Sequence, residues 1–295
     1  MSFKSLPLNR VFETAKAILE KAHIREAALQ SRLITQHVLG LKNHLDTILD
    51  TNRIVSPSAI LKIKTLAQRR SRHVPLQYLL GRSNFYNTEL HVRRGCLIPR
   101  PETEILTDLA IRWLESHRRE PLARVLDMGV GSGNIACSIA QTLNSSRVMG
   151  VDRSLKALRI ARENVTRLGL ERQITLIQSN FFKRVPENLS FDLIISNPPY
   201  IAKKAIQNLP DEIKNFEPIM ALDGGVDGLE AVRHLILNAP KYLKASGALI
   251  FEFGGYHQTK KIEKILKYQS AFKKWHLYED LAGKDRVFLL ESEHG

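Results

Sequence analysis

The chain has 295 residues, of which 43% are hydrophobic and 25% charged, a composition typical of a globular protein with one large domain or two ordinary ones. Two cysteines are too few for a disulfide framework or a zinc site, the histidines show no metal-ligand spacing, and no apolar run approaches the roughly 18 residues of a membrane helix. The net charge is +14, and the first 95 residues hold 16 Lys and Arg against 6 Asp and Glu. This basic N-terminal third favours an anionic partner, either RNA in weak contact or an acidic protein face, as strongly as it favours a solvated helical surface.

The N-terminal segment lacks the apolar core of a secretory signal. Its basic residues would suit an organelle presequence, but Glu13 and Glu20 argue against one, so we expect a mature cytoplasmic start. Residues 9–72 repeat apolar side chains at helical spacing, which predicts a small helical bundle. Gly40 is expected to end the second helix, and Pro57 to lie near the start of the next one.

Residues 76–98 contain aromatic and β-branched residues with turn signals, which predicts a β-hairpin linker. From residue 101 onward, helical segments alternate with about seven short apolar strands. This alternation predicts an α/β fold with a mainly parallel sheet and helices on both of its faces. We therefore expect a helical domain over residues 1–74, a hairpin linker over 75–98 and an α/β domain over 99–295. Cys137 is expected to be a buried free thiol on an apolar helix face.

A glycine-rich loop follows the first strand of the α/β domain. It reads Gly129-Val130-Gly131-Ser132-Gly133, preceded by Asp127. Glycines at this position let the backbone turn sharply and approach a ligand closely. The spacing differs from the G-x-G-x-x-G of dinucleotide-binding folds, and the Gly-Lys-Ser/Thr ending of a phosphate-binding loop is absent.

The next two strands end in residues suited to bind a nucleoside. Asp152 ends the second strand, where an acid accepts hydrogen bonds from ribose hydroxyls in related α/β folds. Asn180 and Phe181 follow the third strand and offer an amide for an adenine edge and a ring for its face. Ligands of such sheets bind beyond the carboxyl ends of the strands. The arrangement resembles the S-adenosylmethionine pocket of class I methyltransferases, which have a Rossmann-like fold.

The strand over residues 191–196 delivers Asn197-Pro198-Pro199-Tyr200 to the same edge of the sheet. Asn-Pro alone is a common turn, but two prolines and an aromatic residue after a buried strand suggest more. Prolines fix the backbone and remove its donors, so carbonyl groups are left in set directions. The Asn197 side-chain carbonyl and the Pro198 backbone carbonyl could hold the two hydrogens of an amide or amino nitrogen. Tyr200 could pack against that planar group.

Eight sequence blocks in order are similar to the HemK/PrmC family of release factor glutamine methyltransferases. Those outside the loop and the tetrad include PLQYLLG at 75–81, LIPRPETE at 97–104, EPIMALDGGVDGL at 217–229 and GALIFEFGGYHQ at 247–258. The resemblance implies methylation of N5 of the glutamine in the Gly-Gly-Gln loop of class I peptide chain release factors, with S-adenosylmethionine as donor. It also implies that the N-terminal helices help to recognise the release factor.

The resemblance assigns residues 129–133, Asp152, Asn180, Phe181 and Asn197 to the cofactor, and residues 197–200 to catalysis and substrate binding. Asn180 stands where the family commonly has an acid, and the segment between Glu252 and Gln258 has one extra residue. Arg100 and Glu102 receive no role beyond lining the site or forming a structural ion pair.

The residues leave other functions open. One alternative is an amino methyltransferase that acts on nucleic acid bases, for which no target-recognition domain is recognisable. A second is methylation of a glutamine in ribosomal protein uL3, whose enzyme usually lacks the run Pro101-Glu102-Thr103-Glu104 seen here. A third is a binding module that has lost its activity, against which the intact loop, Asp152 and the tetrad argue.

Overall fold

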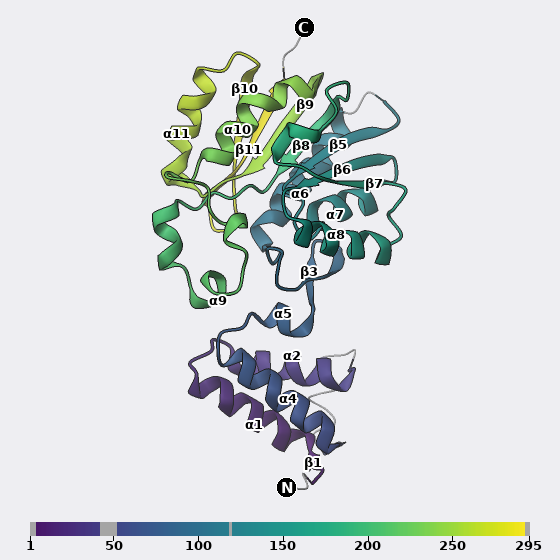
Figure 1. Ribbon diagram of the computed structural model, residues 1–295, viewed down its shortest axis with the longest axis vertical. Coiled ribbons are helices and arrows are strands. Elements are labelled where there is room, and N and C mark those ends of the chain that lie inside the picture. The colour runs from purple at the N-terminus through teal and green to yellow at the C-terminus, as the bar shows by residue number, and fades with distance from the viewer. Residues whose placement is uncertain (1–3, 42–51, 118–119, 293–295) are drawn as a thin grey trace. The chain divides into compact units, whose positions relative to one another are not determined.

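The computed structural model describes residues 4–41, 52–117 and 120–292 and divides into two compact units (Figure 1). The first unit contains the described residues up to Gly81 together with Pro210–Phe216. The second contains Arg82–Leu209 and the described residues from Glu217 onward. The boundary between the two units thus falls after residue 81, whereas the sequence suggested boundaries at 74 and 98, and seven residues of the expected α/β domain belong to the helical unit.

The first unit is helical, as predicted over most of residues 9–72; residues 42–51 of that range lie outside the described residues. Its helices are α1 (Leu8–Lys21), α2 (Ala27–Leu39), α4 (Pro57–Arg70), α5 (Leu76–Leu80) and α9 (Asp211–Lys214). Two short strands, β1 (Leu6–Pro7) and β2 (Ile54–Val55), pair antiparallel. The motif LQYLL of the expected hairpin linker is therefore helical, and the hairpin itself is shorter than predicted.

The sequence pattern of the helical unit explains its packing. Helix α1 buries Leu8, Val11, Ala15 and Leu19, which recur every three or four residues and so share one face. Helix α4 begins as predicted at Pro57, where the Ser56 side chain caps the backbone N–H of Ala59. The second helix ends just before Gly40, also as predicted.

Helix α9 is tied to this unit by an ion pair. Arg70 of α4 is buried and its guanidinium lies 2.8 Å from the carboxylate of Glu212. Arg70 also donates hydrogen bonds to the side chain of Gln30 and to the carbonyl of Val74. These contacts satisfy a buried guanidinium that would otherwise be costly.

The second unit is built on a seven-stranded sheet with the order β10-β11-β9-β8-β5-β6-β7. All neighbouring strands are parallel except β11, which is antiparallel to β9 and to β10. The strands are β5 (Ala123–Met128), β6 (Ser146–Asp152), β7 (Ile174–Gln178), β8 (Phe191–Ser196), β9 (Leu243–Glu252), β10 (Phe272–Glu279) and β11 (Asp285–Ser292). The predicted mainly parallel α/β sheet is confirmed.

Helices cover both faces of the sheet (Figure 1). The helices are α6 (Pro101–His117), α7 (Asn134–Thr142), α8 (Leu155–Arg167), α10 (Glu230–Asn238) and α11 (Tyr256–Lys267). Short 3-10 turns lie at η1 (Phe181–Arg184), η2 (Lys203–Asn208), η3 (Ile219–Ala221) and η4 (Ala239–Tyr242). The hairpin β3 (Arg82–Phe85) and β4 (Thr88–His91) packs near α7 and α8. Sequence patterns predicted all of these helices except α11, and they did not predict η1, η2 or η3.

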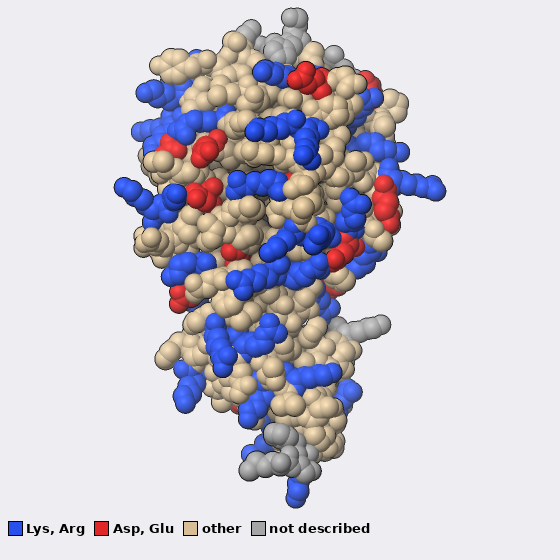
Figure 2. Space-filling model, viewed as in Figure 1, with Lys and Arg blue, Asp and Glu red and all other residues tan. Residues whose placement is uncertain are grey.

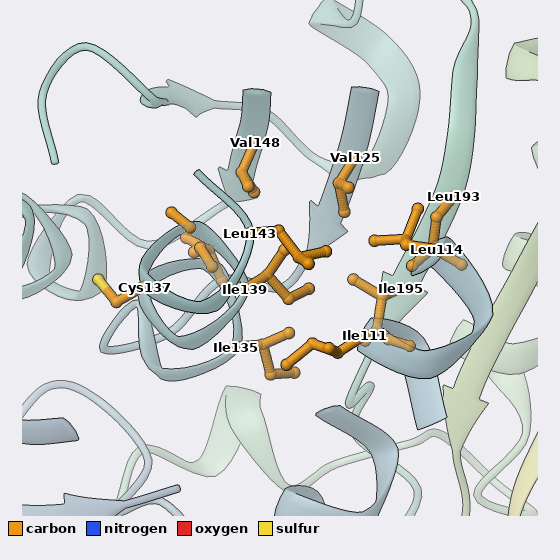
Figure 3. Packing of buried hydrophobic residues seen from close by; sticks show 14 of the residues in the cluster. Ile111, Leu114, Val125, Ile135, Cys137, Ile139, Leu143, Val148, Leu193 and Ile195 are labelled. Carbon is orange, nitrogen blue, oxygen red and sulfur yellow. The ribbon is translucent and has the colours of Figure 1, made fainter. Parts of the chain in front are cut away.

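Two hydrophobic cores lie on opposite faces of the sheet because successive strand residues point to opposite sides. Leu193 and Ile195 of β8 belong to the core beneath α6, α7 and α8, whereas Ile194 belongs to the core beneath α10 and α11. Figure 3 shows side chains of α6 and α7 converging on strands β5, β6 and β8. Cys137 of α7 is buried in this core and forms no disulfide, as predicted.

On the face shown in Figure 2, basic side chains are scattered over the helical unit. The exposed basic residues of this unit include Arg10, Arg25, Lys62 and Arg69. No helix in the described ranges is long and apolar enough to cross a membrane.

Candidate active site

A cavity of about 180 Å³ opens in the second unit beyond the carboxyl ends of β5, β6 and β8. This is the edge at which ligands of parallel α/β sheets bind. The loop after β4 and the segment before α10 form further walls. The lining residues used below are Gly129, Gly131, Asp152, Asn180, Phe181, Asn197, Pro198, Pro199, Pro218 and Met220.

The glycine loop passes from β5 to α7 through residues with left-handed backbone. Gly129, Gly131 and Gly133 have φ values of 85°, 55° and 86°, a backbone region that residues other than glycine rarely adopt. The N–H groups of Gly129 and Val130 both donate to the carbonyl of Val151, at 2.7 and 2.9 Å. The glycines therefore serve a tight turn that is bonded to the neighbouring strand β6.

Asp127 lies beneath this loop and is fully buried. One carboxylate oxygen accepts a hydrogen bond of 3.1 Å from the backbone N–H of Ala136 in the first turn of α7. The other oxygen, Oδ1, is buried without a hydrogen-bond partner in the described structure. Burial raises the pKa of Asp127 to about 7, and the hydrogen bond from Ala136 opposes this rise only in part. Asp127 does not line the cavity, so its carboxyl group supports the loop from below.

Asp152 ends β6 and faces the cavity. Its Oδ2 accepts a hydrogen bond of 3.0 Å from Gly131, and its Oδ1 accepts one of 2.8 Å from Ser154. Burial raises the pKa of Asp152, and these backbone donors counteract the rise. A carboxylate has about four acceptor positions, so two remain for donors of a ligand.

Asn180 and Phe181 follow β7 and line the same cavity. Phe181 has a left-handed φ of 51°, which is rare for a bulky residue and marks a position set by its surroundings. Its ring lies 4.3 Å from the ring of His234 on α10. Partial burial and the nearby Lys183 lower the pKa of His234, so a neutral imidazole supports the phenyl ring at neutral pH.

Asn197 directly follows the end of β8, and its side-chain amide is bound by a hydrogen bond within the protein. Asn197 Nδ2 donates a hydrogen bond of 2.7 Å to Thr103 Oγ1 of α6. The Thr103 hydroxyl donates in turn to Glu252 Oε2 at the end of β9, also at 2.7 Å. Thr103 and Glu252 are both buried and do not line the cavity, whereas Asn197 does.

Tyr200 completes this network from the other end of the tetrad. Its hydroxyl donates to Glu252 Oε1 at 3.1 Å. Burial raises the pKa of Glu252 to about 7 and also raises the pKa of Tyr200, which therefore stays protonated at neutral pH. Tyr200 does not line the cavity, so the structure places its ring beside Glu252 rather than in the cavity wall.

Gln258, in the first turn of α11, holds the backbone of the tetrad. Its Nε2 donates to the carbonyls of Tyr200 and Gly228, at 2.9 and 3.3 Å. Its Oε1 accepts from the N–H of Gly254 at 2.8 Å. The segment Glu252–Gln258 thus contacts the tetrad without lining the cavity.

Arg100 pairs with Glu217 and not with Glu102. Glu217 is buried and also accepts a hydrogen bond of 3.0 Å from the N–H of Ile98. The next residues, Pro218 and Met220, line the cavity, and the Met220 carbonyl accepts from Arg153 at 3.2 Å. The ion pair therefore anchors one wall of the cavity to the loop before α6.

The structure brings most of the predicted site residues to one cavity, but four of them do not line it. These four are Val130, Ser132, Gly133 and Tyr200. Sequence reasoning gave no role to Thr103 or Glu252, although both lie in sequence blocks that carried the resemblance. In the parts of the chain that the structure describes, no group of acidic, His or Cys side chains is arranged to hold a metal ion.

Residues 10–81 match the PrmC N-terminal domain, and residues 104–214 match the methyltransferase small domain. A "Release factor glutamine methyltransferase" of Caulobacter vibrioides is 33% identical over 97% of this chain and 96% of its own length. The chain belongs to the release factor glutamine methyltransferase family. A second protein of that name, from Thermodesulfovibrio yellowstonii, is 40% identical over 78% of this chain and 80% of its own.

The family assignment agrees with solved structures of more distant methyltransferases. The hMettl16 catalytic domain has a TM-score of 0.56 and 17% identity, and the alignment covers 83% of this chain and 86% of that one. At this level of identity the likeness concerns the fold alone. This member of the glutamine methyltransferase family thus has the expected class I methyltransferase fold.

Proposed function

We propose that the chain transfers a methyl group from S-adenosylmethionine to N5 of the glutamine in the Gly-Gly-Gln loop of class I peptide chain release factors. The observation that carries this proposal is the likeness to named release factor glutamine methyltransferases over nearly the whole chain, with Asn197 lining the cavity beside the glycine loop. The names of the relatives point to a release factor glutamine as the methyl acceptor, and the residues that line the cavity fit the binding of the donor and of the glutamine amide.

The cavity residues fit the proposed donor. S-adenosylmethionine carries its methyl group on a positively charged sulfur, which makes that carbon electrophilic. Gly129 and Gly131 would let the backbone approach the methionine part, and the two remaining acceptor positions of Asp152 would bind the ribose hydroxyls. Asn180 and Phe181 line the cavity and would contact the adenine, Asn180 through its side-chain amide and Phe181 through its ring.

The tetrad supplies what a glutamine side chain needs to react. An amide nitrogen is a weak nucleophile because its lone pair is delocalised. Asn197 Oδ1 and the Pro198 carbonyl would accept its two hydrogens, hold the nitrogen in place and stabilise the positive charge that grows on it. As the N–C bond forms, the bond between the methyl carbon and the sulfonium sulfur would break, the neutral thioether S-adenosylhomocysteine would leave, and the nitrogen would lose one proton to water. Tyr200 would fix the tetrad through Glu252 rather than by touching the acceptor.

The helical unit is proposed to contribute to recognition of the release factor. Residues 10–81 of this unit match a domain that occurs in this family, and its exposed basic residues would favour an acidic protein face. A weak contact with RNA is the alternative. Competition between unlabelled RNA and release factor for the enzyme at constant ionic strength distinguishes the two partners.

A methyl-transfer assay with labelled S-adenosylmethionine tests the proposed function. Purified release factor and its variant with the loop glutamine changed to alanine are the paired acceptors, and DNA, ribosomal RNA and protein uL3 are the other arms. Label on the wild-type release factor alone is expected. Label on nucleic acid or uL3, with none on the release factor, would replace the proposal by the corresponding alternative.

A further inference from the structure

The hydrogen bonds behind the tetrad form one connected chain. It runs from Asn197 Nδ2 to Thr103 Oγ1, from Thr103 to Glu252 Oε2, and from Tyr200 to Glu252 Oε1. Thr103 and Glu252 are separated by 149 positions in sequence and are buried. Their contact joins the start of α6 to the end of β9 directly behind the loop that holds Asn197.

The chemistry of the three side chains sets a direction along this chain. An ionised carboxylate only accepts hydrogen bonds, so both the Thr103 and the Tyr200 hydroxyl must donate to Glu252. A hydroxyl has a single hydrogen, so Thr103 then has only lone pairs for its other neighbour. The Asn197 amide must therefore present its NH₂ group to Thr103, and its carbonyl oxygen takes the opposite side. Networks of this kind determine which way an amide is turned.

We propose that Thr103 and Glu252 are positioning residues that fix the direction of the Asn197 amide, so that its carbonyl oxygen is presented to the acceptor nitrogen. This role rests on the proposed function for its consequence in catalysis. If the Asn197 amide were turned around, its NH₂ group would face the hydrogens of the substrate glutamine amide, and two hydrogen-bond donors would oppose each other. The glutamine amide would then lose one of the two carbonyl groups that accept its hydrogens.

The orientation of the Asn197 amide depends on pH through the charge state of Glu252. Glu252 faces Thr103 and Glu102 on α6, Tyr200 after β8 and Arg286 on β11. Burial raises its pKa to about 7, Glu102 raises it further, and the hydrogen bonds and Arg286 lower it. Below this pKa the carboxyl group carries a hydrogen that it can donate to Thr103, which frees the Thr103 hydroxyl to turn toward Asn197. The direction of the amide is then no longer fixed.

The first test compares Thr103→Val with Thr103→Ser in steady-state methylation of the release factor. Thr103→Val should lower kcat about tenfold or more, the effect of losing one orienting hydrogen bond, with the dissociation constant of S-adenosylmethionine unchanged within about threefold. Thr103→Ser should restore most of kcat. Thr107→Val is the matched control, because Thr107 is equally buried on the same helix but donates only to the backbone carbonyl of Thr103.

The second test is the pH profile of kcat. In the wild type, kcat should rise through a pKa near 7 and level off above it, because ionised Glu252 is the form that orients the amide. Glu252→Gln should lose this step and have a lower plateau. Unchanged kcat in Thr103→Val, failure of Thr103→Ser to rescue, or an unchanged pH step in Glu252→Gln would each overturn the proposal.

A spectroscopic readout separates this proposal from the proposed function. The side-chain amide signals of Asn197, labelled with ¹⁵N and assigned by their loss in Asn197→Ala, should shift with a midpoint near pH 7 in the wild type. The shift should be absent in Glu252→Gln and in Thr103→Val. A flat titration in the wild type would refute the network even if the release factor is methylated. A clear titration would support it even if the acceptor is a different molecule.

Discussion

The carboxylate of Asp152 at the end of β6 accepts a hydrogen bond of 3.0 Å from the backbone N–H of Gly131 in the glycine loop. One side chain thus joins two neighbouring strand ends and also faces the cavity. Because the backbone N–H of Ser154 bonds to its second oxygen, the protein itself holds the carboxylate in one orientation. Binding of a nucleoside to such a preformed group avoids the cost of ordering it.

Replacement of Asp152 by alanine is expected to have its main effect on the affinity for S-adenosylmethionine, which should fall. The oxygens that are proposed to accept hydrogen bonds from the ribose are lost, and the glycine loop loses the hydrogen bond from Gly131 to Asp152. The dissociation constant, measured by calorimetry, should rise about tenfold or more, equivalent to ~1.4 kcal/mol or above. Glu89→Ala, which removes an exposed carboxylate outside the cavity, is the control and should bind normally. Unchanged affinity in Asp152→Ala would reject the ribose assignment.

Replacement of Asn197 by alanine is expected to lower turnover far more than cofactor affinity. Its amide is proposed to orient the acceptor glutamine, and a misplaced acceptor costs on the order of 100-fold in rate. Single-turnover rates and calorimetry on the same preparation measure the two quantities. The exposed Asn208 provides a comparison, since Asn208→Ala should change neither. Equal losses of rate and affinity in Asn197→Ala would contradict the role given to this amide.

Replacement of Asp127 by asparagine is expected to stabilise the protein above neutral pH. The pKa of Asp127 is raised from 3.8 to about 7 by burial, so the folded state holds a proton that the unfolded state has released. The contribution of Asp127 to stability therefore falls as pH rises from about 4 to about 7, and above that range an ionised carboxylate is buried. The neutral amide avoids this cost. Thermal unfolding at pH 8 should show a gain of about 1–3 kcal/mol relative to the wild type.

The same comparison at pH 5 is the control for Asp127. There the wild-type carboxyl group is protonated in the folded state, so asparagine should offer little advantage. A variant that is more destabilised at pH 8 than at pH 5 would mean that the Asp127 charge is needed for folding.

Replacement of Gly228 by alanine is expected to displace the tetrad. A Cβ at this position would overlap the Tyr200 carbonyl oxygen and lie 2.5 Å from Gln258 Nε2. We expect a loss of about 1–3 kcal/mol in stability together with a drop in kcat. Gly169→Ala isolates the backbone effect, because Gly169 has a similar positive φ but nothing within 4 Å of its added Cβ. If both variants behave alike, the close approach to Tyr200 is not what requires glycine.

Local patterns were sufficient to predict the sheet and the edge at which the site lies. The glycine loop, Asp152 and the tetrad each follow a strand directly, so their position in the fold is fixed by a few neighbouring residues. Thr103 could not be placed in this way, because its partners Glu252 and Asn197 are 149 and 94 positions away. The same applies to Arg100, whose partner Glu217 is 117 positions away and takes the place of the suggested pairing with Glu102.

The elements that sequence reasoning missed have weak patterns for a physical reason. Helix α11 buries the polar Gln258 and Thr259 in its first turn, and its inward apolar residues Ile262, Ile265 and Leu266 all lie in its second half, so the apolar period is short. Residues 210–216 join the helical unit through the pair Arg70–Glu212, a long-range contact that leaves no periodic signal. The domain boundaries inferred from composition differ from the compact units for this reason.

The position of Gln258 has a consequence for how the enzyme could fail. The amide belongs to the first turn of α11, which is anchored to the sheet by Ile262 and Leu266. Fraying of that turn would release the Tyr200 carbonyl and the Gly228 turn together, while the bond between Asp152 and Gly131 would remain. Damage near the C-terminal helix is thus expected to give a protein that still binds S-adenosylmethionine but no longer methylates the release factor.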